Sequence, residues 1–166
     1  MPLAQLNIAR MLAPAINHPI MADFVSQLDS INQLAEQSDG FVWRLKGDGN
    51  DATSLRPFDD ERIIVNLSVW SSVEQLQAFV FKSRHTAVMK DRRKWFEKPR
   101  VDSPDQMMTV LWWIPAGHVP TVGEAKARLE HLNRNGSGPH AFTFREVWPE
   151  PEISNETVQN KGDFSL

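Results

Sequence analysis

Hydrophobic and polar positions alternate along Arg62–Trp70, the stretch around which the rest of the chain is organised. This period of two is typical of a β-strand with one aliphatic face. The other face carries Asn66, Ser68 and Trp70, an amide and a hydroxyl beside an aromatic ring, which is a composition typical of a pocket wall. Ser71 and Glu74 follow with the spacing of a capping box, so a helix is expected to begin there.

Similar patterns predict the remaining elements. Further strands are expected at 3–10, 41–45, 107–114 and 141–147, and further helices after Pro19 and Thr121. The run 107–114 is apolar throughout, which favours a central strand covered on both faces. The helix after Ser71 is expected to resume in a second run with inward positions at His85, Val88, Met89, Arg92, Trp95 and Phe96.

The order of these elements predicts an α+β fold. Strand, helix, strand, strand, helix, strand is the order of a ferredoxin-like antiparallel sheet with helices on one face. The other face would then need a cover, and a two-fold homodimer is the simplest one. One domain is expected over 1–148, followed by a flexible tail over 149–166 that lacks any apolar period.

Composition narrows the function classes. A chain of 166 residues fits one domain, and the absence of cysteine excludes disulfides, thiolate metal sites and cysteine nucleophiles. A net charge of −3 gives no reason to expect a nucleic-acid partner. Without a signal peptide or a membrane-length apolar stretch, a cytoplasmic, bacterial-type protein with no membrane partner is expected.

Several motifs carry a family resemblance. The strand end at Trp70, followed by Ser71, Glu74, Phe79 and His85, resembles the dimeric α/β-barrel superfamily, which includes antibiotic-biosynthesis-type monooxygenases. Longer motifs resemble the uncharacterised bacterial domain-of-unknown-function family 3291. They are GFVWRL at 40–45, NLSVW at 66–70, RRKWF at 92–96 and LWWIPAGHVPTVGEAKARLEHL at 111–132. The resemblance spans nearly all of 3–147 and implies a dimeric α/β barrel, with no established substrate.

The same superfamily contains haem-degrading monooxygenases, which use an Asn on the first strand and a Trp and a His on the second crossover helix. Asn7 matches the first of these positions, whereas Phe79 and Met89 occupy the other two. His85 lies one helical turn too early to replace the histidine. We therefore expect no cofactor, with haem as the alternative.

The residues selected for chemistry are His85, Arg92 and Asn66. A histidine can act as a general base near neutral pH, and an arginine or an amide can stabilise developing negative charge. They are expected in one cavity between the sheet and the second crossover helix. The expected substrate-binding residues are Ser68, Trp70, Phe79, Trp95, Asn7, Arg44 and His118, and no metal motif is present.

Each candidate also has a structural interpretation. His85 could bond to a backbone carbonyl, Arg92 could form a surface ion pair, and the tryptophans could fill the core. Two classes of function therefore remain open. One is a metal-free monooxygenase or an isomerase- or cyclase-like enzyme acting on a hydrophobic aromatic or polyketide-like substrate; the other is a non-catalytic ligand- or haem-binding module.

Overall fold

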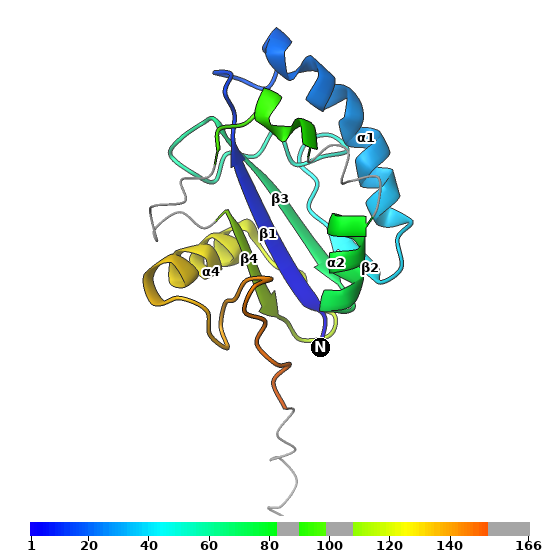
Figure 1. Cartoon of the computed structure of the whole chain (residues 1–166), viewed down its shortest axis with the longest axis vertical. Helices are drawn as coiled ribbons and strands as arrows, with labels where there is room; N and C mark the ends of the chain where they lie inside the picture. Colours follow the sequence, from blue (N-terminus) through cyan, green and yellow to red (C-terminus); the bar gives the residue numbers. More distant parts are fainter. Residues whose placement is uncertain (83–89, 99–107, 153–166) are drawn as a thin grey trace, which may run out of the picture.

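The computed structural model describes residues 1–82, 90–98 and 108–152. In these ranges one antiparallel sheet is formed by β1 (Leu3–Arg10), β2 (Phe41–Arg44), β3 (Ile63–Trp70) and β4 (Thr109–Trp113). The strand order is β2-β3-β1-β4, so β1 lies between β3 and β4 as in a split βαβ unit (Figure 1). The predicted α+β, ferredoxin-like antiparallel fold is confirmed.

The crossover helices α1 (Ala22–Glu36) and α2 (Val73–Lys82) cover the same face of the sheet. Leu3 and Trp70 are opposite each other on β1 and β3, so both side chains point to one face. On that face they pack in a single cluster with Ala35 of α1 and Leu76 of α2. This part of the arrangement agrees with the expectation from the sequence.

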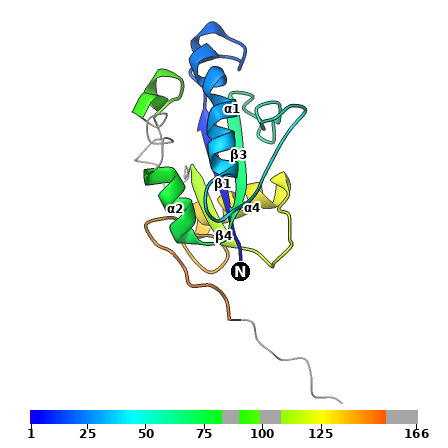
Figure 2. The same ribbon diagram turned by 90° about the vertical axis from the view of Figure 1, so that its right-hand side faces the viewer.

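The helix α4 (Val122–Asn135) covers the opposite face. Its inward residues Ala125, Leu129 and Leu132 pack on the aliphatic side chains of β1 and β3, and Figure 2 shows α2 and α4 on opposite sides of the strands. The expectation that all helices lie on one face is therefore wrong for α4. The homodimer was expected because this face needed a cover. Since α4 covers it within the chain, that reason no longer applies, and the homodimer stays a prediction.

Two expected strands also differ. β4 lies at the edge of the sheet and not at its centre, although Val110, Leu111 and Trp112 are fully buried. Leu111 and Phe142 exchange two backbone hydrogen bonds of 2.9 Å, which cap this edge. Phe142 belongs to the segment expected as a last strand, but turns on both sides of it prevent a regular strand over 141–147.

The helix starts follow the sequence signals closely. The helix expected after Thr121 begins there, and Thr121 accepts a hydrogen bond from the backbone N–H of Glu124 at 3.1 Å, which is the first half of a capping box. For α2 the capping oxygen belongs to Ser72, which accepts from the backbone of Gln75, one residue later than expected. Within the described ranges, no helix combines the length and apolar character needed to span a membrane.

Candidate functional site

A polar band crosses the sheet face that α1 and α2 cover. Gln5 lies opposite Ser68 and Asn7 lies opposite Asn66, so four polar side chains of β1 and β3 share this face. An apolar cluster containing Trp70 bounds the band at one end, and a second cluster bounds it at the other. The prediction that Asn66 and Ser68 point the same way, toward a helix, is confirmed.

One half of this band is closed. Ser68 Oγ donates to Gln5 Oε1 and accepts from the indole nitrogen of Trp70, both at 3.0 Å. Trp70 is fully buried and stacks on Phe79 of α2 with ring centroids 5.1 Å apart. Ser68, Trp70 and Phe79 therefore form interior packing under α2, and they do not line the pocket described next.

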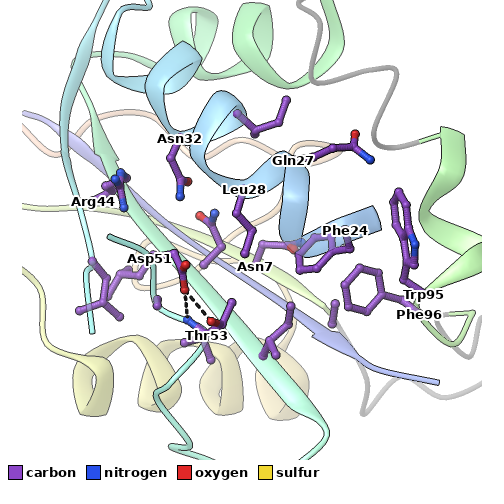
Figure 3. A pocket seen from close by; sticks show the side chains of 18 of the residues that line it. Asn7, Phe24, Gln27, Leu28, Asn32, Arg44, Asp51, Thr53, Trp95 and Phe96 are labelled. Atoms are coloured by element: carbon purple, nitrogen blue, oxygen red, sulfur yellow. Dashed lines mark hydrogen bonds between the residues drawn. The ribbon is translucent and has the colours of Figure 1, made fainter. Parts of the chain in front are cut away.

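The other half of the band opens into a pocket under α1 (Figure 3). Asn7 and Asn66 lie on its sheet side, and Asn66 is exposed although its neighbours on β3 are buried. The helix α1 contributes Leu28, Ile31 and Asn32. Counted with its open mouth, the space is about 970 Å³.

Aromatic side chains form one end of the pocket. The ring of Phe24 lies 5.7 Å from the ring of Trp95 and 5.0 Å from that of Phe96, measured between centroids. The backbone N–H of Leu12 donates to the carbonyl of Trp95 at 2.8 Å, and Met11 pairs with Phe96. These bonds fasten the aromatic end to the chain just after β1.

The opposite end of the pocket is polar and internally bonded. Arg44 Nε donates to Glu36 Oε1 at 2.9 Å, and its two terminal nitrogens donate to the backbone and side-chain oxygens of Asn50. Burial acts to raise the pKa of Glu36, but the hydrogen bonds and charges of Arg44 and Lys46 together outweigh it, so this pKa is lowered. Asp51 accepts two hydrogen bonds from Thr53. Arg44 thus ties the segment after β2 to α1.

Arg92 differs from Arg44 in its surroundings. It begins the short 3-10 helix η2 (Arg92–Lys94), lines the pocket and is half-buried. Its Nη2 atom has almost no solvent contact and no hydrogen-bond partner among the described residues. Burial lowers the pKa of Arg92, because desolvation disfavours the charged form. The pocket therefore contains a cation that the described part of the chain leaves uncompensated.

The structure brings five predicted site residues together: Asn7, Arg44, Asn66, Arg92 and Trp95 all line this pocket. His118 is not among them, since its Nε2 lies 2.7 Å from Glu124 Oε2 near the start of α4. His85 lies outside the described residues. The chemical roles assigned to these side chains stay predictions.

The pocket lies beneath α1, a helix to which no site residue was assigned, whereas the sequence predicted a cavity beneath the second crossover helix. Because part of that helix, including His85, lies outside the described residues, that cavity stays a prediction. Phe24, Leu28 and Asn32 were therefore missed as lining residues, as were Asp51 and Thr53. The sequence did contain one signal, the polar Asn32 one helical turn after Leu28 on the inward face of the helix. In the structure this side chain is only 8% exposed.

Metal ligation finds no support in the described side chains, where no three histidine or acidic residues converge as a possible ligand set. The groups that face the pocket are amides, one hydroxyl, two guanidinium groups, one carboxylate and apolar side chains. Their chemistry suits hydrogen bonding, charge pairing and ring packing.

No curated protein matches the sequence. Similar solved structures include protein YJCS from structural genomics, with 12% identity, a TM-score of 0.44 and coverage of 69% of this chain and 100% of that one. They also include NE2512, a protein of unknown function from Nitrosomonas europaea, with 15% identity, a TM-score of 0.46 and coverage of 72% and 95%. At these values neither carries an argument about function. The family model described as "Domain of unknown function (DUF3291)" matches residues 2–158, and the chain belongs to this family.

Proposed function

We propose that this chain binds a small organic molecule in the pocket between α1 and the sheet. One observation carries the proposal: Asn66 is exposed in the middle of a strand whose neighbouring residues are buried. A helix-covered sheet face is normally closed by interdigitating side chains. Here the cover is incomplete, and it is incomplete over two amides that face the same space.

The lining supports a ligand with both apolar and polar parts. Binding sites for small molecules are mostly apolar clefts with a few convergent polar groups. Phe24, Leu28 and Ile31 supply apolar surface from α1, while Asn7 and Asn66 supply hydrogen-bonding groups from the sheet. The described groups are therefore those of a binding site for a ring-containing molecule of modest size.

A catalytic function would require more than binding of the ligand. In a metal-free monooxygenase or an isomerase- or cyclase-like enzyme, Arg92 and Asn66 would stabilise developing negative charge, and a base would accept a proton. Support for that form is that Arg92 and Asn66 line one pocket. The candidate base, His85, lies outside the described residues. Binding is accordingly the function we propose.

The proposal can be tested with the full chain and a panel of aromatic and alicyclic fragments, with binding measured by ligand-observed NMR. Leu28→Trp places an indole in the pocket from α1. Val25→Trp is the matched control, because Val25 lies on the same helix and is 41% exposed. Fragments are expected to bind the wild type and Val25→Trp but not Leu28→Trp. Binding that survives Leu28→Trp, or a panel with no binder, would contradict the proposal.

A further inference from the structure

We propose that the ligand of this pocket is an organic monocarboxylate with a ring. Its carboxylate pairs with Arg92, and its ring lies against Phe24 and Trp95. The inference rests on the proposed function, because it names the class of molecule that occupies the same pocket. It is carried by one unpaired cation beside an aromatic cluster.

Arg92 carries a half-buried guanidinium group in the pocket wall. A guanidinium group has five N–H donors and no acceptor, so burying it without partners forfeits strong hydrogen bonds. Its Nη2 atom is removed from solvent and finds no acceptor among the described residues, and no ion pair joins Arg92 to a described carboxylate. A buried donor without a partner needs an explanation, and in a pocket wall it is a candidate contact for a bound molecule.

The charged groups of the described lining differ in how they are paired. Arg44 forms an ion pair with Glu36 and bonds twice to Asn50, so it has little capacity for a ligand. Asp51 carries a negative charge, accepts from the backbone and hydroxyl of Thr53, and lies with Arg44 away from the aromatic end. Arg92 is therefore the cation of the described lining without an anionic partner, and a carboxylate of the ligand would supply one. A carboxylate also matches the planar fork of a guanidinium group.

Arg92 is close along the chain to an aromatic residue of the pocket, Trp95. Trp95 is the residue that closes η2, and it follows Arg92 within one turn. In Figure 3, Phe24 and Trp95 lie together at one end of the pocket, away from Arg44 and Asp51. An acid bound at Arg92 would thus place its attached ring at the aromatic end.

The experiment compares acids with uncharged amides of the same shape. The probes are benzoate with benzamide, phenylacetate with phenylacetamide, and 2-naphthoate with 2-naphthamide, measured by isothermal titration calorimetry. For pairs that bind the wild type, the acid is expected to bind about ten- to a hundredfold more tightly than its amide. In Arg92→Met this preference should disappear, while amide affinity stays within about twofold.

Arg93→Met is the matched control, since Arg93 carries the same charge on the next residue but is exposed and does not line the pocket. It should keep the acid preference. Thermal unfolding separates binding from packing: Arg92→Met should unfold at or above the wild-type temperature, because it removes a half-buried, uncompensated charge. A lower unfolding temperature together with loss of amide binding would overturn the inference and make Arg92 a packing residue.

The two proposals fail in different ways. Equal binding of acids and amides that Leu28→Trp still blocks would overturn the carboxylate inference and leave the binding function intact. An acid preference that persists in Arg92→Met would likewise overturn the carboxylate inference and leave the binding function intact. If no probe of either kind shows binding that Leu28→Trp abolishes, both proposals are wrong.

Discussion

The two faces of the sheet are built from alternate residues of the same strands, yet they differ sharply. Toward α4, β1 and β3 present an unbroken aliphatic surface, formed by Ala4, Leu6, Ile8, Val65, Leu67 and Val69. Toward α1 and α2, the same strands place four polar residues between two apolar clusters. Because successive side chains of a strand point to opposite faces of the sheet, neighbouring residues can have different roles. One face supplies stability, and the other gives up part of its core for a pocket.

The sharpest test of this comparison uses two adjacent residues of β3. Leu67 is 1% exposed in the α4-facing core, so Leu67→Ala should cost about 2–5 kcal/mol of unfolding free energy. Asn66 is exposed over the pocket, so Asn66→Ala should cost less than about 0.5 kcal/mol. Urea denaturation would measure both. Equal losses would mean that the polar face is as important for stability as the aliphatic one.

A smaller effect is expected within the closed half of the polar band. Ser68→Ala would leave the Trp70 indole nitrogen and the Gln5 amide without their shared partner, at a cost of about 1–3 kcal/mol. Ser71→Ala is the control, since Ser71 is exposed, and it should change stability by less than about 0.5 kcal/mol. Chemical denaturation of both variants checks the difference. If Ser68→Ala is neutral, the band is not held by this bond pair.

The smallest effect concerns pH and the α4 face. Burial acts to raise the pKa of Glu124, but hydrogen bonds from His118 and Trp112 outweigh it, so this pKa lies below its usual value of 4.5. A carboxylate with a lowered folded pKa stabilises the protein above the unfolded pKa and loses that contribution as pH falls through the folded one. Stability should therefore decrease below about pH 4.5.

Glu124→Gln isolates this contribution. On acidification, the free energy of unfolding of the wild type should fall further than that of the variant, by less than about 1 kcal/mol. The difference is small because solvent partly screens the His118–Glu124 pair. Unfolding temperatures recorded from pH 6 to pH 3 would show the two curves converging as the pH falls. Parallel curves over that range would contradict the assignment to Glu124.

The sequence correctly predicted the features that follow from the period of strands and helices. The alternation along β3 correctly placed Asn66 and Ser68 on one face, and the order of elements gave the antiparallel fold. Periodicity identifies the inward side of a helix, but not which part of the sheet the helix crosses. For that reason the sequence predicted a helix after Pro19 but not that its residues Leu28 and Asn32 would line the pocket.

Other features depended on information that local patterns do not carry. The inward stripe of α4 fits either face of the sheet, and only tertiary packing selects the one opposite α2. The turn-rich segment after β2 has no period, so nothing in it indicated that Arg44 and Asn50 would fasten it beside the pocket. At Arg92 the chain forms a 3-10 helix, which changes the spacing on which the helical prediction relied.

The central position of β1 has a consequence for how the protein is made. Leu3 pairs with Trp70 on one side and with Trp113 on the other, so β1 is synthesised before both of its partner strands. At about 5–20 residues per second, the roughly 100 residues that separate β1 from the end of β4 take about 5–20 s. Until β4 has been made, one edge of β1 lacks its neighbour. Folding of this chain should therefore be slow and sensitive to chaperones that hold nascent β1.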